Sequence, residues 1–542
     1  MKFLFTFFTV ALSFLSYTQK ETPKLVVGIV IDQMRYDYLY RFYDKFCEGG
    51  FKKLMNEGSN CKNTMYNYVP TYTAPGHASI YTGTTPSNHG IVGNDWYDRN
   101  LERTINCVED NTVQTLGSSS EEGRCSPKNL KVNTITDQLR LTYKDSKVIS
   151  MSIKNRGAIL PGGHLSNGSY WFDYSSGNFI TSSYFTQEMP SWVTAFNGEK
   201  QAEIFSKQKW ETLLPLSDYY ESREDNSPYE YTFGNKTAPV FPYDLKEMNK
   251  NGLSYSNFVY TPFSNTFLTN FALAAIENEK LGEDKTADFL NISYSTPDII
   301  GHAFGPYSVE IQDCYMRLDL EIKRLIKELE EKVGKDNFVL FLTADHAVAP
   351  VPQYLVDLKL SGGYFYEDAF NLFLDSLSTK KFGQNLVLGE VNNNIYLNRE
   401  KIQALNLTEE EVNQYLAEKI RKYEGIKQVY TSNELMKSGK SDNMLEMVAN
   451  GYHYKESGDI VYVLEANYLP KSSKESSTKG TSHGSPYGYD THVPLLWYGK
   501  SIKAQSIYSR TEIIDISATL VYIMNLQKTN GMTGEPILPV LH

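Results

Sequence analysis

The sequence predicts an α/β fold in which a mostly parallel central sheet carries helices on both faces. The first observation is a set of short, continuous aliphatic runs, which are typical of strands buried on both faces of a sheet. The second is that helical patterns separate these runs, notably across residues 309–333. Strands that alternate with helices indicate a parallel sheet. The expected strands are Leu25–Ile31 and residues 147–153, 289–294 and 338–342, with 493–498 as a further candidate.

Polar residues stand at or near the carboxyl ends of these runs. Asp32 follows the first run and Lys154 the second, Asp298 comes shortly after the third, and Asp345 and His346 follow the fourth. In open parallel sheets, ligands bind beyond the carboxyl ends of the strands. A single Asp after a strand means little, but several such endings predict one shared site.

Two stretches interrupt the alternation of strands and helices. Residues 157–268 are rich in Tyr, Trp, Ser, Asn and Pro and predict an irregular cap over the site, whereas residues 351–478 have strand and helix patterns of their own and predict an inserted α+β subdomain. A chain of 542 residues also exceeds one ordinary core. We expect a signal peptide at 1–18, the cap at 157–268, the inserted subdomain at 351–478, and a catalytic core made of 19–156, 269–350 and 479–542.

The first residues are typical of an exported protein. Lys2 supplies a positive charge, residues 3–15 are apolar, and small or polar residues follow at 16–19. This order describes a secretory signal peptide; a buried first strand or helix is the alternative. The apolar run is shorter than the about 20 residues that span a membrane, and no cysteine follows it as a lipid anchor. We expect a secreted or periplasmic protein without a membrane anchor.

The net charge and the cysteine spacing exclude some classes of binding partner. The formal net charge of −11 argues against nucleic acid, because proteins that bind it neutralise phosphates with a basic face. The five cysteines show no metal-knuckle spacing. In an oxidising compartment Cys107 and Cys125 can close a loop, although structural thiols are the simpler interpretation and one cysteine must stay unpaired. We expect small-molecule partners, and we favour a monomer.

Asp and His side chains form a candidate site for two zinc ions. Asp298 and His302 are four residues apart, which brings both to one face of a helix or tight turn, as a metal pair requires. Oxygen and nitrogen donors without a thiolate suit zinc with room for a non-protein ligand. The six candidate ligands are Asp32, Asp298, His302, Asp345, His346 and His483.

A lone histidine is more often a satisfied core or surface imidazole than a ligand. We assign four histidines to that ordinary role: His89, His164, His453 and His542.

Thr73 is the candidate nucleophile. It lies in the segment PTYTAPGH, before a helical pattern, and Pro75 suits the first turn of a helix. Unpaired N–H groups and the helix dipole favour anions at such an end, and a hydroxyl beside a metal can attack phosphorus. A plain N-cap is the alternative role. Spacing alone does not choose Thr73 over Thr71 or Ser79.

Five motifs together resemble one family. PTYTAPGHASIYTG followed by HGIVGNDWYD resembles the nucleophile region of the type I phosphodiesterase/nucleotide pyrophosphatase branch of the alkaline phosphatase superfamily. VIDQMRYDYL, TPDIIGHAFGP, TADHA and SHGSPYGYDTHVP resemble the metal motifs of that branch, in the expected order. The motifs run from Asp32 to beyond His483 and so cover nearly the whole mature chain.

The resemblance implies a role for each matching position. Thr73 matches the family nucleophile, and Asn94 matches an Asn that donates a hydrogen bond to a phosphoryl oxygen. One zinc would be held by Asp32, Thr73, Asp345 and His346, and the other by Asp298, His302 and His483. His492 competes with His483 for the last place, and we prefer His483 because it precedes Gly in the family manner.

Lys154 and Arg156 indicate which class of phosphate ester the site would bind. They lie in SIKNRGAILPGG, which resembles the segment of threonine-dependent alkaline phosphatases of the flavobacterial type that carry a Lys/Arg pair. Being two residues apart after a strand, both would share one face of an extended backbone. An ammonium and a guanidinium together suit a monoester dianion. A solvated basic loop is the alternative.

These observations predict an exported zinc-dependent alkaline phosphatase that hydrolyses small-molecule phosphate monoesters through a phosphothreonine at Thr73. A nucleotide pyrophosphatase/phosphodiesterase of the same superfamily is the alternative enzyme. A catalytically silent exported protein that binds phosphate or metal is the alternative of another class.

Overall fold

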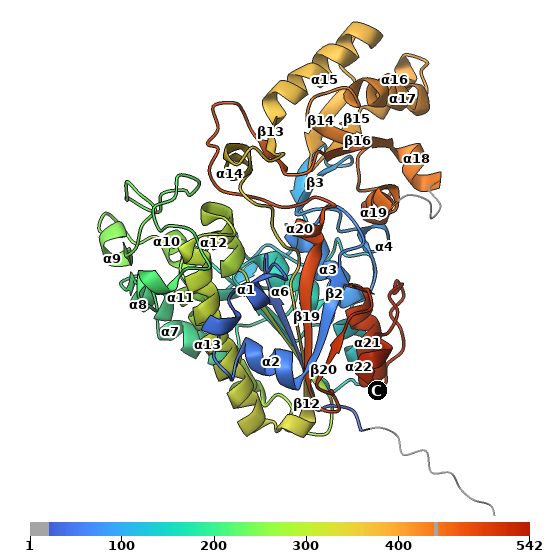
Figure 1. Cartoon of the computed structure of the whole chain (residues 1–542). Coiled ribbons are helices and arrows are strands. Elements are labelled where there is room, and N and C mark those ends of the chain that lie inside the picture. Colours follow the sequence, from blue (N-terminus) through green and yellow to red (C-terminus); the bar gives the residue numbers. More distant parts are fainter. Residues whose placement is uncertain (1–20, 438–442, 542) are drawn as a thin grey trace, which may run out of the picture.

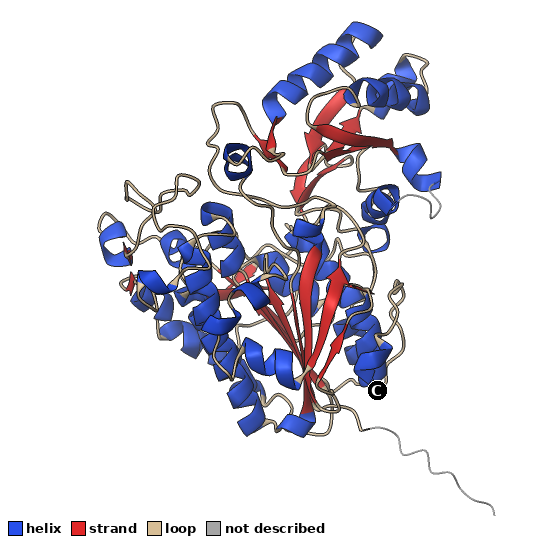
Figure 2. Ribbon diagram, in the orientation of Figure 1, coloured by secondary structure: helices blue, strands red, loops and turns tan. Residues whose placement is uncertain are grey.

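A large twisted sheet forms the centre of the computed structural model, which describes residues 21–437 and 443–541 (Figures 1 and 2). The expected signal peptide lies outside the described residues. The strands of the main sheet, in spatial order, are β20 (Gln505–Ile507), β2 (Ser59–Met65), β19 (His492–Gly499), β12 (Phe338–Thr343), β1 (Leu25–Ile31), β11 (Asp288–Tyr294), β6 (Val148–Ser152), β7 (Gly168–Phe172), β8 (Phe179–Ser182) and β5 (Thr115–Leu116), with β21 (Thr511–Glu512) beside β2.

The middle of this sheet is parallel, as predicted. β12, β1, β11, β6 and β7 pair in parallel, and the first four of them are the four main strands expected from the sequence. All residues of β1, β6, β11 and β12 are buried, which explains their unbroken aliphatic character. The further candidate strand is β19, which pairs antiparallel to both β12 and β2.

Helices cover both faces of the sheet (Figure 2). α3 (Thr73–Thr82) packs against α6 (Asn155–Gly162), and α6 in turn contacts β6, β7 and β11. α11 (Phe263–Glu279) also contacts β6 and β11 and packs against the long helix α13 (Val309–Lys332), which is the helix expected at 309–333. The predicted fold class is therefore confirmed.

The region expected as a cap begins later than the sequence suggested. α6, β7 and β8 fall within residues 157–182 or reach into them, and β7 and β8 extend the main sheet. The composition of this region predicts irregular chain, but the runs SYWF and NFITS fall in or next to β7 and β8, in which every residue is buried. The short helices α7 (Ser191–Gly198), α8 (Gln201–Phe205), α9 (Leu245–Met248) and α10 (Tyr255–Val259) follow and lie at the left in Figure 1.

Residues 363–471 build a second sheet above the first (Figure 1). Its four strands, in the order β14 (Val387–Val391), β15 (Asn394–Leu397), β17 (Ile460–Leu464) and β16 (Ile426–Thr431), pack with α15 (Glu367–Phe382) and α17 (Glu409–Ile420). The buried side chains here, among them Phe370, Leu416 and Ile460, form a cluster separate from the main core.

Two further expectations concern cysteines and membranes. All five cysteines are free, so Cys107 and Cys125 are not joined here, and both thiols are buried. Among the described residues, no helix has the length and apolar character needed to cross a membrane.

Candidate active site

The parallel strands bring the predicted polar residues together at their carboxyl ends. Asp32 directly follows β1, and Asp345 and His346 follow β12, which pairs with β1. Asp298 is the third residue of α12 (Thr296–Phe304), just beyond β11, which pairs with β1 on its other side. Neighbouring parallel strands end at the same edge of a sheet, and all four of these side chains are buried there.

Two overlapping sets of donor atoms have the spacing of a metal site. In each set, one donor atom from every residue lies within 4.8 Å of the others. Asp298 belongs to both sets, and Asp345 Oδ2 lies 3.7 Å from His346 Nε2 beside them. The sets are Asp298, His302 and His483, and Asp32, Asp298 and His346.

Backbone carbonyls fix which ring nitrogen of each histidine is free. The Nδ1 atoms of His302, His346 and His483 lie 2.8, 2.9 and 2.7 Å from the carbonyl oxygens of Thr481, Ala347 and Thr71. A carbonyl only accepts, so each Nδ1 carries a proton, which leaves Nε2 as the atom whose lone pair a metal would take when the ring is neutral. All three Nε2 atoms lie near site carboxylates. This arrangement is typical of metal-binding histidines.

The buried carboxylates lack enough donors within the protein. Asp32 Oδ1 and Asp345 Oδ2 are buried and have no hydrogen-bond partner among the described residues. The ammonium of Lys154 lies 2.7 Å from Asp32 Oδ2 and 2.5 Å from Asp298 Oδ2. Buried carboxylate oxygens without donors are expensive, so this donor set fits bound cations.

The pKa values of the three carboxyl groups are shifted in opposite directions: burial and mutual repulsion raise two of them, and nearby cationic groups lower the third. Burial, together with the charge of Asp298, raises the pKa of Asp32 to about 6, although Lys154 opposes the shift. Burial and Asp32 raise the pKa of Asp345 well above its usual range. The pKa of Asp298 is instead well below its usual value, because His302 and Lys154 outweigh the effect of burial. The pKa values of closely spaced carboxyl groups move apart in this way when the groups share one site.

Two of the histidines are held neutral. Burial lowers the pKa of His483 to about 3, and burial together with His483 lowers the pKa of His346 well below its usual range. Their rings stack with centroids 3.5 Å apart, where two imidazolium charges would repel each other. A neutral imidazole is the form that binds a metal.

Thr73 occupies the first position of α3, as predicted, and its hydroxyl reaches the metal-type cluster. Its Oγ1 lies 3.4 Å from His346 Nε2. The two rival hydroxyls are engaged elsewhere: Thr71 Oγ1 donates to the Ser485 carbonyl, and Ser79 Oγ bonds to His89 Nε2. Gly76 lets the helix approach, because a Cβ there would lie 2.2 Å from the carbonyl oxygen of Asp345.

The side chain of Asn94 occupies an N–H group at the start of α3 that we expected to be available to an anion. Its Oδ1 accepts the Ala74 N–H at 2.9 Å, Pro75 has no N–H, and the Gly76 N–H donates to Tyr72. The first turn therefore offers an anion fewer free amides than expected. Because Oδ1 of Asn94 is used, its Nδ2 group remains to donate at the same place.

Lys154 and Arg156 lie at the site, but not on the extended backbone that we predicted. β6 ends at Ser152, Lys154 is the N-cap of α6, and Arg156 is the second residue of that helix. The prediction that an extended strand places both side chains on one face is therefore wrong, because a helix begins between Lys154 and Arg156. Arg156 Nε is buried without a hydrogen-bond partner among the described residues.

His492 is not part of the cluster. It begins β19, its Nε2 lies 3.1 Å from the carbonyl oxygen of Lys62, and its ring stacks on Tyr36. The structure therefore brings His483, the preferred candidate, to the other donors.

Two residues that the sequence analysis did not assign support the site. His77 lies one turn after Thr73; its Nδ1 bonds to the Thr73 carbonyl at 2.8 Å and lies 3.4 Å from Asp345 Oδ2. Gln33 donates from its backbone N–H to Asp345 at 3.1 Å and from Nε2 to Asp298 at 2.6 Å. His77 stood in the nucleophile motif at helical spacing and could have been found from the sequence.

Gln33 has no comparable signal in the sequence. Its backbone φ is 66°, a left-handed conformation that a side chain rarely adopts. The opposing helix leaves room for it only through Gly301, where a Cβ would lie 1.9 Å from Gln33 Oε1. Such strain persists where the surroundings impose it, frequently at functional sites.

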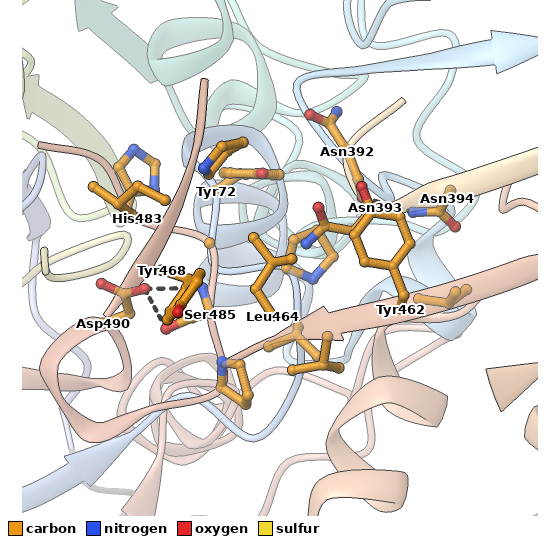
Figure 3. A pocket seen from close by; sticks show the side chains of 18 residues that line it. Tyr72, Asn392, Asn393, Asn394, Tyr462, Leu464, Tyr468, His483, Ser485 and Asp490 are labelled. Carbon is orange, nitrogen blue, oxygen red and sulfur yellow. Dashed lines mark hydrogen bonds between the residues drawn. The ribbon is translucent and has the colours of Figure 1, made fainter. Parts of the chain in front are cut away.

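The inserted subdomain borders the site on the side of His483. A narrow cavity there is lined by Tyr72, His483 and Asp490 from the core and by Asn392–Asn394 and Tyr462 from the subdomain (Figure 3). Ser485 donates from both its N–H and its hydroxyl to Asp490 Oδ2, which fixes the loop that carries His483.

Comparison with known proteins agrees with this geometry. The profile of the type I phosphodiesterase/nucleotide pyrophosphatase family matches residues 26–486. The chain belongs to this family. It is 42% identical to a Myroides odoratus protein named calcium-transporting ATPase over 99% of both chains. It is also 40% identical to alkaline phosphatase PafA of Elizabethkingia meningoseptica, over 96% of this chain and 94% of that one, and 41% identical to alkaline phosphatase PhoV of Synechococcus elongatus, over 96% and 93%.

Solved structures give the same result. The crystal structure of PafA superposes with a TM-score of 0.91 at 39% identity and covers 96% of this chain and 99% of that one. A second PafA structure, with a TM-score of 0.90, is a variant with substitutions at a threonine, an asparagine, a lysine and an arginine. These are the four residue types that we selected as Thr73, Asn94, Lys154 and Arg156.

The first prediction concerns the support that Gln33 gives to Asp298. Replacing it with Leu removes the hydrogen bond that orients Asp298, and we expect metal affinity to fall about 10- to 100-fold, as for other supports of metal ligands. Metal titration of the stripped protein measures the change. Gln403→Leu, on an exposed helix of the inserted subdomain, is the matched control, and equal affinities in both variants would contradict the role of Gln33.

Proposed function

We propose that the chain is an exported, zinc-dependent alkaline phosphatase that hydrolyses small phosphate monoesters through Thr73. The observation that carries the proposal is the position of the Thr73 hydroxyl, 3.4 Å from His346 Nε2 and beside two buried carboxylates, each with one oxygen that finds no donor among the described residues. The full-length similarity to PafA and PhoV, both named alkaline phosphatases, supports the same activity. Export rests on the sequence pattern of residues 1–19.

The donor set suits two zinc ions. Asp32, Thr73, Asp345 and His346 would hold one ion, and Asp298, His302 and His483 the other. Oxygen and imidazole donors without thiolate fit zinc, and the three Nε2 lone pairs are already oriented by backbone carbonyls. When bound, the ions supply positive charge that favours the alkoxide of Thr73 and stabilises the phosphoryl group and the leaving oxygen.

The chain's own residues perform two exchanges at phosphorus. Thr73 Oγ1 loses its proton and forms a bond to phosphorus, while the bond from phosphorus to the ester oxygen breaks and the alcohol departs. The product is phosphothreonine. A water molecule then bonds to phosphorus, the bond to Thr73 Oγ1 breaks, and inorganic phosphate leaves. His77 bonds to the Thr73 carbonyl and so holds the first turn that carries the nucleophile.

Three side chains would grip the nonbridging oxygens. Asn94 accepts the Ala74 N–H through Oδ1, and its Nδ2 group would donate to a phosphoryl oxygen. Arg156 has a buried, unpaired Nε among the described residues, and such a guanidinium is suited to a phosphate oxygen. Lys154 adds an ammonium that is only 11% exposed. A monoester has three nonbridging oxygens and nearly two charges, which can engage all three groups.

Phosphate anhydrides and diesters are the other substrate classes to compare with monoesters. A phosphate anhydride such as ATP can undergo the same exchange at Thr73, and the Myroides odoratus relative is named an ATPase. A diester offers one oxygen and one charge fewer, and it is the substrate of the alternative, the nucleotide pyrophosphatase/phosphodiesterase. A silent metal- or phosphate-binding protein would hydrolyse none of these. Rates for matched aryl monoester, aryl diester and ATP therefore separate the three possibilities.

The metal proposal predicts two zinc ions per chain in the active protein. Chelation should abolish hydrolysis, and added zinc should restore it, because the bound ions would supply the positive charge that favours the alkoxide of Thr73. Elemental analysis alongside activity measures both effects. An active preparation with one ion per chain, or none, would refute the two-metal proposal.

The nucleophile proposal predicts that Thr73→Ala lowers kcat by about three powers of ten or more, with the zinc content retained in large part. Thr73→Ser should keep substantial activity, because it preserves a hydroxyl at the same atom. Thr71→Ala and Ser79→Ala are the matched controls from the same segment. Loss of activity in either control, with normal turnover in Thr73→Ala, would reassign the nucleophile.

The specificity proposal predicts that the double variant Lys154→Ala with Arg156→Ala loses far more monoesterase than diesterase activity. Each charged hydrogen bond is worth about 1.5–3 kcal/mol, so kcat/KM for the monoester should fall about 10²- to 10⁴-fold more than for the diester. Zinc analysis is required, because Lys154 also contacts Asp32 and Asp298. Equal losses for both esters at full zinc content would identify the pair as general supports.

A further inference from the structure

Asn94 stands at the base of a small hairpin that lies outside the main sheet. β3 (Asp95–Asp98) begins directly after it and pairs antiparallel with β4 (Arg103–Asn106). The Asn94 carbonyl accepts the N–H of Cys107, the residue after β4, at 2.9 Å. Its side chain accepts the Ala74 N–H at the start of α3, also at 2.9 Å. Since the hairpin is anchored at this residue, contacts that hold the hairpin also fix the position of the Asn94 side chain.

The inserted subdomain holds this hairpin, and β3 lies next to β14 (Figure 1). Trp96 Nε1 donates to Glu456 Oε2 at 3.1 Å. The guanidinium of Arg99 donates to the buried carboxylate of Asp459 at 2.9 Å. Both contacts fall shortly after Asn94 in the chain. The core and the subdomain are therefore joined next to the residue that would bind a phosphoryl oxygen.

Asn392 of the subdomain lies beside the backbone on both sides of Asn94. Its Nδ2 group donates to the Asp95 carbonyl at 2.7 Å. The same nitrogen faces Gly93, where a Cβ would lie 2.9 Å from it and 2.9 Å from the Asp95 carbonyl oxygen. A side chain at Gly93 would displace either the amide or the carbonyl, so glycine permits this close approach. One side chain of the subdomain thus meets both chain neighbours of Asn94.

The turn that carries Asn392 explains why an asparagine stands there, but not its hydrogen bond. Asn392 and Asn393 are the two residues between β14 and β15, with φ angles of 52° and 62° (Figure 3). A two-residue loop of this kind needs positive φ at both positions, which Asn tolerates well. The Asn393 N–H donates to Glu390 Oε1 at 2.7 Å, and its carbonyl accepts the Tyr462 N–H at 3.0 Å. Asn393 therefore secures the turn through its backbone, whereas Asn392 bonds to the core through its side chain.

We propose that Asn392 is a positioning residue, which holds Asn94 through the Asp95 carbonyl so that the Asn94 Nδ2 group meets a phosphoryl oxygen. The inserted subdomain thereby takes part in the chemistry of the core. This inference rests on the proposed phosphatase function and on the role of Asn94 in it. Hydrogen-bond donors that stabilise a transition state must be placed in advance, and a small misplacement lowers the rate strongly.

Asn392→Gly tests this role, because glycine keeps the positive φ and removes the amide. In the zinc-loaded protein, kcat/KM for an aryl phosphate monoester should fall about tenfold. Asn393→Gly, in the same turn and with the same sign of φ, is the matched control and should change the value less than about twofold. Asn392→Asp, which has the same size and no donor, should reproduce the loss. Equal values for wild type, Asn392→Gly and Asn392→Asp would overturn the proposal.

A double-mutant cycle separates positioning from general support of the fold. In the Asn94→Ala background there is no side chain left to position, so Asn392→Gly should lower kcat/KM less than about twofold there. If Asn392→Gly lowers kcat/KM by the same factor in both backgrounds, it acts on the fold or on another group, and the positioning role is refuted.

Binding of inorganic phosphate keeps this inference distinct from the proposed function. Calorimetry on the zinc-loaded protein should show weaker binding in Asn392→Gly than in the wild type, and no further weakening when Asn392→Gly is added to Asn94→Ala. If the wild type hydrolyses monoesters and Asn392→Gly matches it in hydrolysis and binding, the positioning role fails and the phosphatase stands. If the wild type hydrolyses no ester but this binding pattern is observed, the positioning role stands and the phosphatase fails.

Discussion

Three buried carboxylates at one edge of a parallel sheet impose the arrangement of the whole site. Asp32, Asp298 and Asp345 have almost no contact with solvent, and ionised groups in such surroundings require positive charge or hydrogen-bond donors nearby. The parallel pairing of β1 with β11 and β12 makes their proximity unavoidable. Lys154 meets part of this requirement, and within the described part of the chain Asp32 Oδ1 and Asp345 Oδ2 remain without a donor.

The residues around the cluster hold it in place by using backbone groups. Carbonyl oxygens fix the tautomers of His302, His346 and His483. Gln33 donates to Asp345 from its backbone N–H and to Asp298 from its side-chain amide. These supports come from loops and helix ends far apart in the chain, so the site exists only when the sheet is assembled. A metal bound there would therefore stabilise the folded state as well as serve the chemistry.

The parts of the site that could be predicted follow from short-range rules. An aliphatic run indicates a buried strand, and a polar residue after it indicates the carboxyl edge of the sheet. These two signals were enough to place Asp32 and Asp345 in the site. Helical spacing sufficed to pair Asp298 with His302. Pro75 indicated a helix start near Thr73, but the choice of Thr73 over Thr71 and Ser79 came from the family resemblance. Gln33 could not be found, because its role depends on a left-handed backbone conformation and on Gly301 of another helix. The geometry of Arg156 was also missed, because nothing in SIKNRG shows that the strand ends before Lys154 and a helix begins at Asn155.

Formal charge explains why the proposed activity requires bound cations. In the form that would hold metal, with all three carboxylates ionised and the three histidines neutral, the carboxylates outnumber the ammonium of Lys154 and the guanidinium of Arg156. One negative charge remains, and a phosphate dianion would be repelled from it. Two divalent cations reverse the sign and leave three positive charges, a surplus that matches a dianion and the further charge that develops on the leaving oxygen. The same count distinguishes the alternatives by charge: a diester brings one negative charge and gains less from the positive surplus, so a preference for monoesters follows from the composition of the site once its cations are bound.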